Sequence, residues 1–136
     1  MNQIAQEDVL RALKKFKRLA KQDFLASSLM SNPQFWSEQA EARRAVYDEL
    51  MKWVENDGVE SAYQKAQEWY VTLPQIRMDE PNAPLHGQEQ ALEMFFMVLG
   101  IGAPQIEQWK AQRPASHGST PSTSDDSRLS MGVYGA

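Results

Sequence analysis

The spacing of apolar residues is the feature that most constrains this chain. In five separate stretches they recur at intervals of three and four, and no stretch shows sustained alternation of apolar and polar residues. Intervals of three and four place side chains on one face of an α-helix, whereas a half-buried strand alternates with a period of two. The sequence therefore predicts an all-α protein, an irregular bundle of five or six helices.

The first predicted helix covers about residues 5–21, and its apolar face consists of Val9, Leu13, Phe16 and Ala20. If the same helix continued, Leu25 and Leu29 would lie on its charged side. This change of phase predicts a break near Asp23, which would then cap a short second segment ending near residue 30. A single continuous, bent helix is the alternative.

A long central helix is predicted over about residues 33–56. Ser31 or Asn32 would cap it. Pro33 suits its first position, because the backbone N–H that a proline lacks would have no hydrogen-bond partner in the first turn of a helix. Gly58 would end it. Asp57 would cap the next helix, over about residues 59–73, with Glu60 three residues later as in a capping box.

The C-terminal half is predicted to contain a long loop or hinge over residues 74–87, which hold three prolines. A helix over 88–99 follows, and it is apolar on nearly all sides, so it is expected to be enclosed. A last short helix covers about 103–112. From Pro114 onward Ser, Thr, Gly, Pro and Asp dominate, a composition typical of disorder. The predicted organisation is one helical domain over 1–113 and a disordered tail over 114–136, in which residues 129–134 are a candidate docking motif.

Charge is distributed unevenly along the chain. Its net charge is −4, but the first 21 residues hold six basic and two acidic side chains, while the remainder holds eight basic and sixteen acidic ones. On a helical wheel the basic residues of the first helix form one face opposite its apolar face. We name this the basic face, and it consists of Arg11, Lys14, Lys15, Arg18 and Lys21. Such a cluster suits phosphates or an acidic protein surface, or it is simply a solvated helix face.

Three further features are candidate contact sites. Arg43 falls within the apolar face of the central helix, where it must pair with a carboxylate or meet a partner. The apolar 88–99 helix is either the central helix of the bundle or has one side covered by a second subunit or another protein, and Phe96 and Met97 would then be its interface residues. Trp109, near the end of the folded part, is expected to be partly exposed and to act as an interface anchor.

Catalytic chemistry has little support in the sequence. The chain has no Cys, which excludes thiol catalysis and thiolate metal sites. His86, Glu89 and Glu93 have helical spacing that loosely resembles a metal site, but no matching second set exists. We therefore expect no catalytic residues, no metal and no cofactor. The absence of a signal-like N-terminus or a long apolar run favours a cytoplasmic protein with no membrane association.

These observations favour a non-enzymatic interaction or assembly subunit that acts through protein–protein contacts, either with a protein partner or as a homo-oligomer. The first alternative is a nucleic-acid-associated accessory protein that uses the basic face. The second is a small-molecule or metal-dependent enzyme, which rests only on the spacing of His86 and its neighbours.

Overall fold

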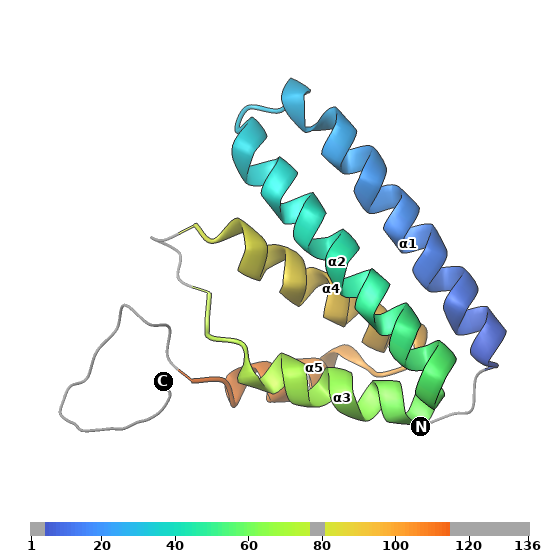
Figure 1. Cartoon of the computed structure of the whole chain (residues 1–136). Helices are drawn as coiled ribbons and strands as arrows, with labels where there is room; N and C mark the ends of the chain where they lie inside the picture. Colours follow the sequence, from blue (N-terminus) through green and yellow to red (C-terminus); the bar gives the residue numbers. More distant parts are fainter. Residues whose placement is uncertain (1–4, 77–80, 115–136) are drawn as a thin grey trace, which may run out of the picture.

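The computed structural model describes residues 5–76 and 81–114. In this part of the chain the protein has five α-helices, one 3-10 helix and no strand, so the predicted all-α fold is confirmed (Figure 1). The elements are α1 (Gln6–Ala26), the 3-10 helix η1 (Ser27–Leu29), α2 (Pro33–Asp57), α3 (Val59–Thr72), α4 (Ala83–Val98) and α5 (Ala103–Ala111). The tail predicted over 114–136, with its candidate motif at 129–134, lies outside the described residues except for Pro114.

The long helix α2 is the centre of the fold, as the sequence predicts. Helix α1 runs antiparallel along it, and the two form a hairpin that extends away from α3 and α5 (Figure 1). Helix α4 packs against α2 as extensively as α1 does, whereas α1 has little contact with any other helix. One end of the hairpin therefore stands apart from the rest of the molecule. We call this end, formed by the last turn of α1 and by η1, the hairpin tip.

The aromatic side chain of Phe96 is the hub of the core where α3, α4 and α5 meet. It is fully buried, and its ring centroid lies 5.4 Å from that of Tyr70 and 5.0 Å from that of Trp109. Both pairs have the edge-to-face geometry that aromatic rings prefer. This arrangement explains most of the apolar character of helix α4: the chain's own helices enclose it on most sides, although Met97 is exposed.

Helix α1 does not break at Asp23. The structure shows the continuous helix that the sequence left as the alternative, and α1 ends only at Ala26, where η1 follows. Asp23 is no cap, because its carboxylate pairs with Arg43 of α2 at 2.7 Å. The shift in the positions of the apolar residues after Asp23 therefore does not mark the end of the helix. The helix keeps its direction, and the apolar residues of its last turn point outward.

Both ends of α2 follow local signals, with one correction. Asn32 caps the helix by accepting a hydrogen bond from the Phe35 N–H at 3.4 Å, and Gly58 ends it at a φ of 89°, where L side chains are strained. The predicted capping box at Asp57 is wrong. Asp57 is the last residue of α2, its carboxylate pairs with Lys65 at 2.8 Å, and no side chain caps α3.

The predicted loop over 74–87 is too long, because α4 already begins at Ala83. Asn82 caps this helix by accepting a hydrogen bond from the Leu85 N–H at 3.0 Å, and Pro84 lies in its first turn. Gly87 does not precede the helix but lies inside it. A Cβ at this position would be 2.4 Å from the Gln39 carbonyl oxygen of α2, so Gly87 allows the two helices to approach closely.

Candidate functional site

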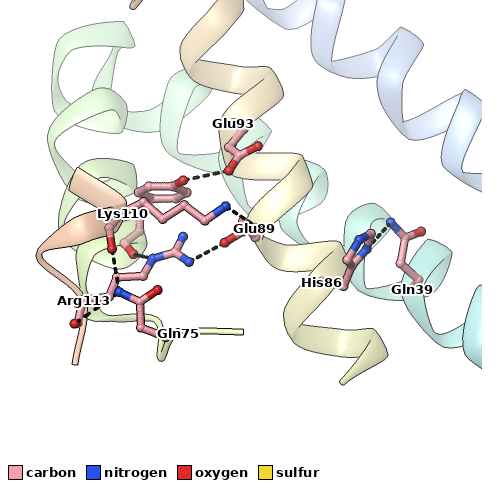
Figure 2. Close-up of polar contacts among 8 residues, drawn as sticks. Gln39, Gln75, His86, Glu89, Glu93, Lys110 and Arg113 are labelled. Carbon is pink, nitrogen blue, oxygen red and sulfur yellow. Dashed lines mark hydrogen bonds and ion pairs between the residues drawn. The ribbon is translucent and has the colours of Figure 1, made fainter. Parts of the chain in front are cut away.

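A buried polar cluster joins the end of α5 to α3 and α4 (Figure 2). Its centre is Arg113, whose side chain has no exposed surface. The guanidinium forms an ion pair with Glu89 of α4, and its Nε donates a hydrogen bond to the Tyr70 carbonyl oxygen at 3.0 Å. It also lies over the Tyr70 ring, with Cζ 4.1 Å from the ring centroid. These contacts compensate a charge that is removed from water, although the Nη2 nitrogen is buried without a hydrogen-bond partner.

Further contacts complete this cluster. The Lys110 ammonium lies 3.5 Å from the second carboxylate oxygen of Glu89. The Tyr70 hydroxyl donates a hydrogen bond to Glu93 at 2.7 Å, and burial together with this bond raises the pKa of Tyr70 far above its ordinary value. The Gln75 side-chain amide donates to the Lys110 carbonyl oxygen at 2.9 Å. The cluster thus fastens the last turn of α5 to the body of the protein.

A second polar cluster lies between α2 and α4. Gln39 is almost fully buried, and its Nε2 donates to the Gln90 side-chain oxygen at 2.5 Å and lies 3.2 Å from Nδ1 of His86. With this amide orientation Nδ1 of His86 accepts the hydrogen bond from Gln39. The ring stands beside those of Phe35 and Trp36, with centroids 5.9 Å and 6.3 Å away. Sequence reasoning missed Gln39, because nothing in the local pattern distinguishes it from an exposed glutamine.

These two clusters contain the three residues whose spacing in the sequence loosely resembles a metal site. His86, Glu89 and Glu93 all belong to α4, but each contacts a different residue on the surrounding helices. Across the described ranges, no group of three His, Asp or Glu side chains is arranged to hold a metal ion. The loose metal-like spacing in the sequence therefore corresponds to three separate structural contacts.

The basic face lies along the outer side of α1. All five of its residues are exposed, because α1 packs on α2 through its opposite side. Arg11 pairs with Asp8 one turn earlier at 2.8 Å. For the other four, the described part of the chain offers no ion pair, and they present four positive charges to solvent over about two turns of helix; they are Lys14, Lys15, Arg18 and Lys21.

Arg43, the cation predicted within an apolar face, lies between α1 and α2. Its side chain is 12% exposed, and it forms its ion pair with the more exposed Asp23 of α1. Its Nε is buried without a hydrogen-bond partner in the structure. Arg43 also lies close enough to Tyr47 to act on that hydroxyl: burial raises the pKa of Tyr47 to about 12, and the charge of Arg43 opposes this rise. The structure thus gives Arg43 a carboxylate partner within its own chain.

The hairpin tip carries an apolar surface that the sequence interpretation missed. Leu25 and Leu29 are 67% and 87% exposed, and Phe24 and Met30 are also exposed. We call these four residues the apolar tip. The signal was present in the sequence as the change of phase after residue 23, but it was interpreted as a break in the helix. Because α1 is continuous, Leu25 instead follows Lys21 by one turn and lies in line with the basic face.

The three predicted interface residues have different environments. Phe96 is fully buried and Trp109 is 6% exposed, so the expectation that Trp109 is partly exposed is wrong. Its ring fills the space between Phe96 and Tyr63, whose centroid is 6.3 Å away. Met97 is 61% exposed and is the only one of the three that a partner can reach without rearrangement.

No protein-family model, no curated protein and no solved structure matches this chain. Within the residues that the structure describes, no helix has both the length and the apolar character needed to cross a membrane.

Proposed function

We propose that the protein is a non-enzymatic interaction or assembly subunit that acts through protein–protein contacts made by the α1–α2 hairpin. The observation that carries this proposal is the apolar tip. Leu25 and Leu29 are among the most exposed large apolar side chains of the described residues, and Phe24 and Met30 lie within the same seven-residue stretch of the chain. Single exposed apolar residues are ordinary on soluble proteins, but a group of them usually marks a contact surface.

Further support comes from what surrounds the apolar tip. The basic face leads directly to it along α1, so one surface offers both apolar area and positive charge. Interfaces of this kind gain affinity from the buried apolar centre, and charges at the rim guide association. The buried polar groups around Arg113 and Gln39, by contrast, are bonded mostly to one another.

The test is a comparison of three forms of the protein during affinity purification from the native host. Wild type, a Leu25→Glu/Leu29→Glu variant and a Met97→Glu variant are purified with and without nuclease. We expect wild type and Met97→Glu to recover the same protein partner or further copies of the chain, and the tip variant to lose it. Equal recovery by all three forms would contradict the proposal, since Met97 is exposed but lies outside the apolar tip.

A second candidate function is nucleic-acid association through the basic face. The observation that favours it is the exposure of all five cations on one side of α1. Neutralising phosphates releases counterions, so binding would weaken steeply as salt rises. Replacing Lys14, Arg18 and Lys21 by Glu should abolish binding to duplex DNA or RNA and remove the salt dependence. Absence of wild-type binding at low salt would exclude this candidate.

A further inference from the structure

The outer side of α1 carries a row of cations that leads to the apolar tip. Lys14, Arg18 and Lys21 follow one another at spacings of four and three, which place them in line along the helix, and each is exposed. We call these three residues the cation row. It covers about 10 Å of the helix axis, at 1.5 Å per residue. Lys15 is exposed beside it, and among the described residues no carboxylate pairs with any of these four cations.

No carboxylate lies on this side of the helix to balance the cation row. Between residues 9 and 30, all of which the structure describes, the only acidic residue is Asp23. Its carboxylate is directed toward α2, where it pairs with Arg43 at 2.7 Å. Lys17 also lies toward α2 and pairs with Asp48 at 2.6 Å. The ion pairs between the two helices are therefore separate from the outer side of α1, which keeps positive charges only.

The line of the cation row continues into apolar side chains. Leu25 follows Lys21 by one turn and is 67% exposed, and Leu29, in η1, is 87% exposed. Within the described residues α1 packs extensively only on α2, so its outer side has no neighbour from this chain. A segment laid along this side would meet cations first and leucines at the end.

We propose that the outer side of α1 binds an acidic helical segment of a partner protein. Carboxylates of this segment pair with the cation row, and its apolar residues remove Leu25 and Leu29 from water. A helix suits this surface because carboxylates spaced three and four residues apart on it repeat at the same interval as the cations of α1. The proposal rests on the proposed function and gives the chemistry of its protein partner.

Nucleic acid and membranes each match this surface less well. Phosphates would pair with the cation row, but a nucleic-acid backbone offers no apolar surface to cover Leu25 and Leu29. A helix that binds an anionic membrane turns its apolar side toward the acyl chains. The apolar side of α1 is already packed on α2, and the side that remains is the one with the cations.

The charge of the whole chain directs an acidic partner to α1. Residues 1–21 hold six basic and two acidic side chains, and the rest of the chain holds eight basic and sixteen acidic ones. An acidic segment is therefore repelled by most of the molecule and attracted along its first helix. This difference restricts the contact to one side of the hairpin.

The test is the binding of a synthetic peptide to the purified full-length chain, measured by fluorescence anisotropy. The probe is a helical peptide of about 20 residues in which glutamates spaced four and three apart are followed, one turn later, by two leucines. It is made in both chain directions, so that either orientation along α1 is tested. One control peptide has lysines in place of the glutamates, and another has serines in place of the leucines.

Two charge-reversal variants are compared. Arg18→Glu/Lys21→Glu changes the cation row, and Lys52→Glu/Lys65→Glu is the matched control, because it changes the net charge equally at exposed positions of α2 and α3. Circular dichroism verifies that both variants are helical. Neither variant alters the two ion pairs that join α1 to α2.

We expect the wild type and the matched control to bind the probe, with an affinity that falls as salt rises. Arg18→Glu/Lys21→Glu should bind it about tenfold more weakly or worse, because like charges then face each other. The same variant should gain binding to the lysine peptide, a result that a merely misfolded chain cannot give. Leu25→Ser/Leu29→Ser should weaken binding of the probe by about tenfold, as should the serine peptide with the wild type.

Several results would overturn the proposal. The first is a wild-type chain that binds the probe in neither direction at low salt up to ~100 µM. Equal binding by Arg18→Glu/Lys21→Glu and its matched control is the second, and equal binding of the leucine and serine peptides is the third. Tighter binding to duplex DNA or to vesicles containing phosphatidylserine would assign the surface to those partners. A wild-type dimer that excludes the probe would assign it to a second copy.

The purification experiment tests the proposed function separately. If the tip variant loses its partner there while the probe fails to bind, the proposed function stands and only the acidic helical partner is contradicted. Equal recovery by all purified forms contradicts the proposed function even if the probe binds.

Discussion

The two ends of this molecule differ in how far their large side chains are removed from water. Where α3, α4 and α5 meet, even an arginine is fully enclosed, and its contacts are supplied by the same chain. At the hairpin tip, Leu29 is 87% exposed although it is as apolar as the residues of the core. The first end is complete by itself, whereas the second leaves apolar surface in water. We therefore expect substitutions at the first end to affect stability most, and substitutions at the second to affect the proposed contacts.

Removing Arg113 should have the largest effect on stability. It tests directly whether stability is concentrated where α3, α4 and α5 meet. Arg113→Ala leaves Glu89 buried without its closest partner, and losing one member of a buried ion pair costs ~3–5 kcal/mol. Urea unfolding followed by circular dichroism measures this loss. Lys110→Ala is the control, because its ammonium lies 3.5 Å from the same carboxylate and is partly exposed. Equal small losses for both variants would show that the cluster does not hold α5 in place.

Adding a methyl group at Gly87 should give the next largest effect. A Cβ there would be 2.4 Å from a backbone oxygen and 2.9 Å from the Ala42 Cβ, so α2 and α4 must separate. Overpacking of this kind costs ~1–3 kcal/mol. At Gly102 an added Cβ meets only Pro104 at 3.6 Å, an ordinary contact, so Gly102→Ala should change the free energy of unfolding little. The midpoints of thermal unfolding of the two variants test this difference. An unchanged midpoint in Gly87→Ala would mean that α2 and α4 can move apart without loss of stability.

Replacing each of the two asparagine caps allows a direct comparison of stability at the two ends of the molecule. Asn82 accepts its hydrogen bond at 3.0 Å beside the packed body, and Asn32 accepts its own at 3.4 Å near the hairpin tip. Replacing an N-cap asparagine by Ala typically costs ~1 kcal/mol. We expect Asn82→Ala to approach this value and Asn32→Ala to fall below it, because the longer bond is weaker. Chemical denaturation of both variants tests the order, and the reverse order would contradict it.

The apolar tip should have the smallest effect on folding. Leu29→Glu replaces a side chain that is already 87% exposed, so the free energy of unfolding should change by less than ~0.5 kcal/mol. Its effect should appear in association instead. A large loss of stability in Leu29→Glu would show that the tip is part of the folding core and would remove the contrast between the two ends.

Local chemistry explains which parts of the fold could be predicted. The start of α2 at Pro33 and its end at Gly58 depend on groups within a few residues, namely a capping amide and a glycine with positive φ. The helical class itself follows from the spacing of apolar residues, which one chain segment displays on its own. Burial of Phe96 was only partly anticipated, since an all-round apolar helix can be enclosed either by its own chain or by a partner.

The remaining features depend on contacts between residues that are far apart in the sequence. The sequence by itself determined the helices and the existence of a basic face on α1, because these properties need only neighbours along the chain. Only the tertiary structure decided that Gly87 belongs inside a helix, since the reason is a carbonyl on α2. It also decided that Arg113 is buried, because its partners come from α3 and α4. Leu25 points to solvent for the same kind of reason: α2 covers only one side of α1, and no other helix among the described residues reaches the opposite side.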